Sequence, residues 1–168
     1  MRLFIAIHLS DAQRAAVLEA QGAFRGAGVR GNYTPVENLH LTLAFIGEYP
    51  DPETVLEAIS GVEYRPFELT LRGLGAFGDL WWIGIEPSPA LSNDVRALRH
   101  ALAEAGIPFD RKRFSPHITL VRRAVPGPRG MPGIEVPPVS AEIHRLSLMR
   151  SDRGRGGMIY TEIGTVSF

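Results

Sequence analysis

Hydrophobic and polar residues alternate along this chain with two periodicities, one of two residues and one of about 3.6 residues. The clearest alternation covers residues 39–47, where large hydrophobic residues alternate with His40, Thr42 and Ala44. The hydrophobic face of this segment consists of Leu39, Leu41, Leu43 and Phe45. Such a pattern is typical of a half-buried strand. Alternation or short apolar runs predict further strands at 2–9, 32–36, 67–77, 80–85, 117–123, 141–150 and 158–168.

Helical spacing of hydrophobic residues predicts three helices, at 11–27, 51–60 and 88–105. Ser10 precedes the first and is a favourable N-cap residue. Pro52 suits the first position of the second helix, and Gly106 with Pro108 ends the third. The Pro- and Gly-rich segment 125–138 predicts a loop, and the sequence SDRGRGG at 151–157 predicts a mobile basic loop.

The predicted order of elements is β-α-β-β-α-β-β-α-β-β-β, which mixes hairpins with long helices. This order favours an α+β fold rich in antiparallel strands. A chain of 168 residues suits one domain, residues 1–168, or two small lobes that share an interface. No GxGxxG or GxxxxGK[ST] motif is present, so nothing supports binding of a dinucleotide or a nucleoside triphosphate.

Composition narrows the chemistry further. Hydrophobic residues make up 45% of the chain and charged residues 21%, as in ordinary globular proteins. The chain has no cysteine, which excludes disulfides, a thiolate nucleophile and cysteine-based metal sites. No apolar run approaches the roughly 20 residues of a membrane helix. We therefore expect a cytoplasmic protein.

The formal net charge of zero conceals an uneven distribution. Residues 1–109 contain 8 basic and 13 acidic residues, whereas residues 110–168 contain 10 basic and 5 acidic ones. The segment from Arg111 to Arg129 has six basic residues and no acidic one. This segment fits either a partner that carries phosphate or a solvated basic surface.

Two segments of the chain share a motif of the form His-x-Thr-x with hydrophobic residues at x. The first is His40-Leu41-Thr42-Leu43 and the second is His117-Ile118-Thr119-Leu120. On a strand, residues two positions apart point to the same face. Each motif would thus direct an imidazole and a hydroxyl to one side while its hydrophobic residues anchor the strand in a core.

If the two motifs face each other, two imidazoles and two hydroxyls converge. Two histidines in opposite protonation states can act as general base and general acid. The two hydroxyls can donate hydrogen bonds to phosphate oxygens. This chemistry needs no metal or other cofactor. A single His-x-Thr on a strand is usually only part of a strand, so the argument depends on the repeat.

The paired motifs resemble those of the two-histidine phosphoesterase superfamily, and most closely the RNA 2',3'-cyclic phosphodiesterases, also called 2'-5' RNA ligases. The similarity extends to residues 2–7, 37–47, 65–67, 82–85 and 114–122 in the same order. The resemblance implies two related α–β lobes around a central groove. It also implies hydrolysis of an RNA terminal 2',3'-cyclic phosphate to a 2'-phosphomonoester, without a cofactor, and ATP-independent 2'-5' ligation by the reverse chemistry.

The resemblance also implies roles for individual residues. His117 would deprotonate the attacking water and His40 would protonate the departing 3' oxygen, although the sequence allows the reverse assignment. Thr42 and Thr119 would hold phosphate oxygens. Arg122 matches a substrate-binding arginine that follows the second motif. Strict alternation directs Arg122 away from His117, so a β-bulge or the end of the strand is required for it to reach the groove.

Several other residues are considered and set aside. Phe4 is a weaker candidate for stacking on a base. The sequence indicates that Trp81 and Trp82 pack in a central strand. It places His8 at the end of the first strand and His144 beside Arg145 within a late strand. It also places His100 beside Arg96 and Arg99 on the solvent face of a helix.

Two alternative functions stay open. One is a phosphodiesterase that acts on small cyclic nucleotides or on ADP-ribose cyclic phosphate. The other is an RNA-binding module with little catalysis. For the leading function we expect a monomer whose partner is an RNA with a 2',3'-cyclic phosphate end, tRNA fragments among them, and no membrane.

Overall fold

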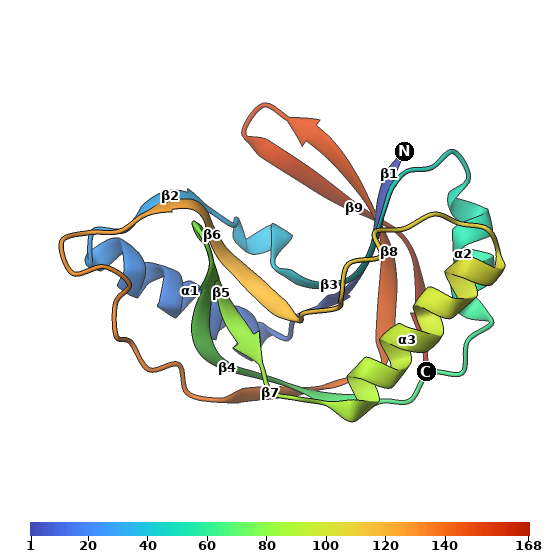
Figure 1. Ribbon diagram of the computed structural model, residues 1–168, viewed down its shortest axis with the longest axis horizontal. Coiled ribbons are helices and arrows are strands. Elements are labelled where there is room, and N and C mark those ends of the chain that lie inside the picture. Colours follow the sequence, from blue (N-terminus) through green and yellow to red (C-terminus); the bar gives the residue numbers. More distant parts are fainter.

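The computed structural model describes all residues from Met1 to Phe168. It contains three α-helices, one short 3-10 helix and nine strands (Figure 1). The helices are α1 (Asp11–Gly26), α2 (Pro52–Ser60), α3 (Pro89–Glu104) and the 3-10 helix η1 (Val36–Asn38). The strands are β1 (Arg2–His8), β2 (Arg30–Tyr33), β3 (His40–Glu48), β4 (Phe67–Phe77), β5 (Leu80–Ile85), β6 (His117–Val125), β7 (Val139–Ile143), β8 (Arg145–Gly154) and β9 (Gly157–Ser167).

The strands form two antiparallel sheets, which confirms the predicted α+β class. The four-stranded sheet has the order β3-β1-β8-β9, and the five-stranded sheet has the order β2-β6-β5-β4-β7. Helix α1 packs on the five-stranded sheet, whereas α2 and α3 pack on the side of the four-stranded sheet (Figure 1). The sheets do not correspond to successive halves of the chain. The four-stranded sheet combines the first strand with the last two.

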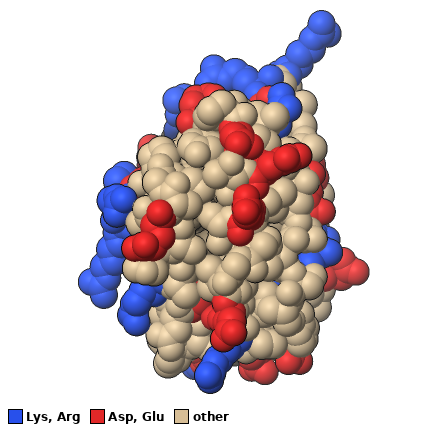
Figure 2. Space-filling view, turned by 90° about the vertical axis from the view of Figure 1, so that its right-hand side faces the viewer, with Lys and Arg blue, Asp and Glu red and all other residues tan.

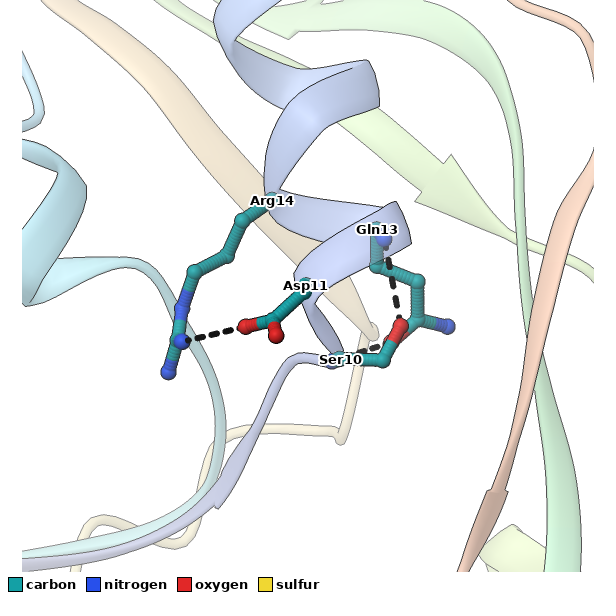
Figure 3. A network of polar contacts seen from close by, with 4 residues as sticks. All are labelled: Ser10, Asp11, Gln13 and Arg14. Atoms are coloured by element: carbon teal, nitrogen blue, oxygen red, sulfur yellow. Dashed lines mark hydrogen bonds and ion pairs between the residues drawn. The ribbon is translucent and has the colours of Figure 1, made fainter.

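Each helix begins after a capping residue, of which the sequence predicts Ser10. The Ser10 side chain accepts a hydrogen bond from the backbone N–H of Gln13, and the Gln13 side chain accepts one from the backbone N–H of Ser10 (Figure 3). This reciprocal arrangement is a capping box, which satisfies backbone donors at the start of a helix. Asp51 caps α2 and Ser88 caps α3, each followed directly by a proline.

One hydrophobic core of 33 buried residues joins the two sheets and the three helices. It includes Leu3, Ile5 and Ile7 of β1 together with Ile83 of β5 and Ile118 of β6. A second, small cluster of Phe4, Ala6 and Met149 lies on the other face of the four-stranded sheet. None of the helices is long and apolar enough to cross a membrane.

Three predictions about the elements are wrong in detail. Residues 141–150 do not form one strand: β7 and β8 meet at His144 and belong to different sheets, which makes nine strands instead of eight. Residues 151–157 are not a mobile loop, because β8 and β9 remain paired as far as Gly154 and Gly157. The short strand predicted at 32–36 begins and ends earlier, at Arg30 and Tyr33.

Candidate active site

The two His-x-Thr motifs lie on different sheets and face one cavity. The first motif begins β3 and the second begins β6. The cavity has a volume of about 990 Å³, which is within the range of small-molecule sites. His40, Thr42, His117, Thr119 and Arg122 all line it. The fold thus brings all five predicted site residues together.

Both histidines are oriented by the same backbone contact. Nδ1 of His40 lies 2.6 Å from the carbonyl oxygen of Asn38, and Nδ1 of His117 lies 2.7 Å from that of Ser115. A carbonyl can only accept, so each Nδ1 carries the proton and donates it. Each Nε2 is then the nitrogen that can exchange a proton with a substrate. Nε2 of His40 accepts from the Thr42 hydroxyl at 2.8 Å.

His40 is enclosed by aromatic rings of its own sheet. The ring centroids of Phe4 and Tyr160 lie 5.0 and 5.3 Å from the centroid of its imidazole. Burial lowers the pKa of His40 to about 4, against the opposing effect of the hydrogen bond to Asn38, and the nearby charges of His8 and Arg122 lower it further. The imidazole of His40 is therefore neutral at pH 7 in the free protein.

His117 lies against aromatic rings of the other sheet. Phe77 packs edge-on at a centroid distance of 5.1 Å, and Trp82 lies at 6.1 Å. The Trp82 ring covers Gly75, where an added Cβ would come within 2.2 Å of it. Trp81 instead points into the core and packs against Phe24. Of the two tryptophans, therefore, only Trp82 packs beside His117.

A β-bulge follows the threonine in each motif. Thr119 pairs with Trp82 and Val121 with Trp81, so Leu120 is an extra residue in β6. In β3, Thr42 pairs with Ala6 and Ala44 with Ile5. Leu43 between them is therefore an extra residue. A bulge changes which residues share a face beyond it.

These bulges explain where two side chains point. In β6 the bulge buries Val121 and directs Arg122 to the cavity, as the sequence required for Arg122 to reach the groove. In β3 it buries Ala44 and moves Phe45 out of the main core. The predicted alternation of 39–47 is therefore wrong beyond Leu43. A second irregularity after Arg122 places Arg123 in the left-handed region, at φ 52°.

A helix side chain binds the carbonyl of each bulged leucine. The buried Gln21 of α1 donates through Nε2 to the carbonyl of Leu120 at 3.0 Å and to that of Thr34 at 2.9 Å. Arg99 of α3 donates to the carbonyl of Leu43 from Nη2 at 3.1 Å. Neither residue is predicted as functional from the sequence, whose pattern places Arg99 on a solvent face. A polar residue on the buried face of a helix is the signal that identifies Gln21.

The remaining walls of the cavity are cationic. Arg25 and Arg30 line it together with Arg122, and no Asp or Glu does. The guanidinium of Arg25 lies 4.0 Å above the ring of Tyr33. An anionic ligand would therefore meet three arginines and two imidazoles. Nowhere do three His, Asp or Glu side chains gather in the way that a metal ion requires.

The residues set aside from the sequence lie outside the cavity. His8, His100 and His144 approach Glu162, Glu104 and Glu142, respectively, at 3.3, 3.8 and 3.5 Å. Phe4 is only 3% exposed and packs beneath His40, so it presents no free face to a base.

Comparisons with known proteins agree with this arrangement. The family model described as 2'-5' RNA ligase superfamily matches residues 10–155. An RNA 2',3'-cyclic phosphodiesterase of Thermus thermophilus is 36% identical over 181 residues, which cover 96% of this chain and 87% of that protein. The Escherichia coli protein of the same name is 31% identical over 171 residues, which cover 96% and 93%.

Solved structures give the same result. Escherichia coli LigT in its apo form matches with a TM-score of 0.82 at 28% identity, over 99% of this chain and 96% of that chain. LigT complexed with 3'-AMP matches with a TM-score of 0.81. Because the family model spans most of the chain and the relatives match over nearly its whole length, this protein belongs to the 2'-5' RNA ligase superfamily.

Proposed function

We propose that this protein is an RNA 2',3'-cyclic phosphodiesterase that converts the cyclic phosphate at an RNA end to a 2'-phosphomonoester. The observation that carries the proposal is the cavity into which two Nδ1-anchored histidines, two threonines and Arg122 converge. Relatives that align over nearly the whole chain have this name. The cationic walls suit an anionic phosphodiester.

The reaction requires one proton to be removed and one to be delivered. A water molecule attacks phosphorus, His117 Nε2 takes its proton, and the bond from phosphorus to the 3' oxygen breaks. His40 Nε2 protonates the departing 3' oxygen, so the product has a 2'-phosphate and a 3'-hydroxyl. This division of roles is the one that the family resemblance suggests. General acid–base catalysis of this kind accelerates a reaction by about 10² to 10⁴.

The pKa of His40 gives a reason to test the reverse assignment. Because burial keeps His40 neutral near pH 7, it can act as the acid only if the bound phosphate raises its pKa. As a base, neutral His40 needs no such change. The two assignments are distinguished by a substrate whose bridging 3' oxygen is replaced by sulfur, because a thiolate leaves without protonation.

The activity of each alanine variant on the sulfur-bridged substrate identifies the acid and the base. The alanine variant of the acid regains most of its lost activity on the sulfur-bridged cyclic phosphate, whereas the alanine variant of the base does not. Recovery by His40→Ala supports the assignment above, and recovery by His117→Ala reverses it. Recovery by neither variant contradicts general acid catalysis by either histidine.

The threonines and Arg122 bind the phosphate in this proposal. The Thr42 hydroxyl, which donates to His40 Nε2 in the free protein, turns to a non-bridging oxygen when the phosphate binds. Thr119 donates to the other non-bridging oxygen. Arg122 supplies a positive charge that stabilises the additional negative charge of the transition state.

The central experiment uses an RNA that ends in a 2',3'-cyclic phosphate, incubated with the protein in EDTA. The wild type is expected to form the 2'-phosphate, and His40→Ala and His117→Ala are each expected to lower kcat by about 10² to 10⁴. His100→Ala, a change at an exposed histidine of α3, is the matched control. A folded wild type that produces no 2'-phosphate contradicts the proposal, and loss of activity in EDTA alone contradicts metal independence.

The same assay, with other acceptors and substrates, also tests RNA ligation and the two alternative functions. With an RNA 5'-hydroxyl in place of water, attack on the cyclic phosphate yields a 2'-5' linkage without ATP. Small cyclic nucleotides and ADP-ribose cyclic phosphate serve as competing substrates. An RNA-binding module would bind RNA without turnover. We expect a monomer that acts in the cytoplasm, with tRNA fragments among its substrates, and size-exclusion chromatography tests the monomer.

A further inference from the structure

The paired ends of β8 and β9 extend beyond the sheet to which they belong. Pairing of β1 with β8 ends where Arg2 meets Ser151, but pairing of β8 with β9 continues to Gly154 and Gly157. Residues 152–159 therefore form a two-stranded ribbon, which we call the β8–β9 ribbon. Figure 1 shows it projecting away from the rest of the molecule at the top of the view.

One side of the β8–β9 ribbon forms a wall of the cavity. Gly156, Gly157 and Met158 line the cavity, as does Tyr160 just below the ribbon. The side-chain amide of the buried Asn38 donates to the carbonyl of Met158 at 2.9 Å. This bond ties the ribbon to the residue whose own carbonyl orients His40. The ribbon is thus held in place beside the reacting groups.

The β8–β9 ribbon has two arginines that no acidic residue neutralises. Arg153 pairs with Met158 across the strands, so its side chain is on the face of the ribbon that borders the cavity. Arg153 and Arg155 are exposed and form no ion pair. Arg150, on the opposite face of β8, is bound to Asp152 at 2.9 Å instead. The free charges are thus on the cavity side and at the tip.

The opposite wall of the cavity also has exposed arginines that form no ion pair. Arg25 and Arg30, at the end of α1 and the start of β2, are exposed and line the cavity. Neither forms an ion pair. By contrast, Asp and Glu side chains are spread over the face that Figure 2 shows, which is the side of α2 at the right of Figure 1. Lys and Arg lie mainly at the margins of that face. Unpaired positive charge on both sides of a groove is how proteins follow a single-stranded nucleic acid backbone.

We propose that the β8–β9 ribbon and the Arg25–Arg30 wall bind the phosphodiester backbone of the RNA behind its terminal nucleotide. The proposal rests on the proposed function and makes it more specific: the preferred substrate is an oligonucleotide, not a cyclic mononucleotide. Arg153 and Arg155 contact only nucleotides upstream of the cyclic phosphate.

The test compares a five-nucleotide RNA that ends in a 2',3'-cyclic phosphate with the cyclic mononucleotide of the same base. For the double variant Arg153→Ala/Arg155→Ala we expect kcat/KM on the oligonucleotide to fall about tenfold, while turnover of the mononucleotide changes by less than about twofold. The slope of log kcat/KM against log salt concentration should become shallower by about 0.7 for each lost phosphate contact. Arg96→Ala, on the exposed face of α3, should change none of these values.

Each other outcome has a definite meaning. Equal losses on both substrates, or no loss on either, overturn the backbone contact while the proposed function stands. If the wild type hydrolyses neither substrate, the proposed function fails instead. Binding of an RNA with an unreactive 2'-phosphate end then tests the ribbon separately: an unchanged Kd in the double variant overturns the inference, and a Kd raised about tenfold supports it.

Discussion

His40 and His117 make the same backbone contact in different surroundings. Each Nδ1 donates to the carbonyl two residues earlier, but only His40 is packed against Phe4 and Tyr160 and has its Nε2 bound to the hydroxyl of its own motif threonine, Thr42. Burial lowers the pKa of His40 because it disfavours the charged form of an imidazole.

We expect the His40 ring to titrate near pH 4 in the free protein, because burial is the largest effect on its pKa. Inorganic phosphate in the cavity should raise this pKa, since a nearby anion stabilises the imidazolium. NMR titration of the histidine ring protons, assigned with His40→Ala, measures both values. A free-protein pKa near 6.5 that phosphate leaves unchanged would contradict this description of the site.

The same shift makes stability depend on pH. The folded pKa of about 4 lies below the unfolded value of about 6.5, so the unfolded chain takes up the proton first as the pH falls. The free energy of unfolding should therefore decrease by up to about 3 kcal/mol between about pH 6.5 and pH 4 through His40. Urea unfolding at several pH values measures this loss, and His40→Ala should lack that part of it.

At the level of elements, two strands depart from regular pairing where the chemistry is placed. The leucine after each threonine is a bulge, and a side chain from a packed helix binds its carbonyl. A bulge redirects every side chain beyond it. Gln21 binds the bulge of β6 and does not line the cavity, so we expect it to influence where Arg122 points.

We expect Gln21→Leu to lower the free energy of unfolding by about 1–3 kcal/mol, because the buried carbonyls of Thr34 and Leu120 lose a donor. It should also raise KM for RNA, since Arg122 follows the bulge. Gln13→Leu is the matched control: Gln13 is also buried on α1 but donates to Leu69 of β4, away from the motif. Equal effects of the two variants on KM would contradict a role of Gln21 in positioning Arg122.

The sequence predicts most elements and five of the residues that line the cavity, but not others such as Arg25, Arg30 and Tyr160. Alternation and capping residues identify strands and helices because they depend on near neighbours in the chain. The junction at His144, where the chain passes between sheets, depends on contacts with distant strands, and no local pattern records it. The bulge in β3 was missed because Leu43 also fits regular alternation. The bulge in β6 was expected only as a condition for Arg122 to reach the groove. Arg99 was missed because it binds a carbonyl 56 residues away in the sequence.

At the scale of the whole molecule, the cavity lies between two sheets that share one core. The 33 buried residues of this core come from both sheets and all three helices, so neither sheet has an interior of its own. Small domains with one core unfold cooperatively.

We therefore expect a single unfolding transition. Far-ultraviolet circular dichroism and the fluorescence of Trp81 and Trp82, which report on the five-stranded sheet, should give the same midpoint in urea. Both signals should also move together in variants of β1, a strand of the other sheet. Separate midpoints would show that the two sheets unfold independently.

The position of β8 and β9 in the four-stranded sheet has a consequence for the order of events during synthesis. Among the strands of this sheet β1 emerges first from the ribosome, yet one of its two partners is β8, which follows nearly all the other elements described. The aromatic ring of Tyr160 beside His40 arrives later still. A nascent chain contains both histidines long before this sheet can form. Hydrolysis of a cyclic phosphate should therefore begin only once β9 has been translated.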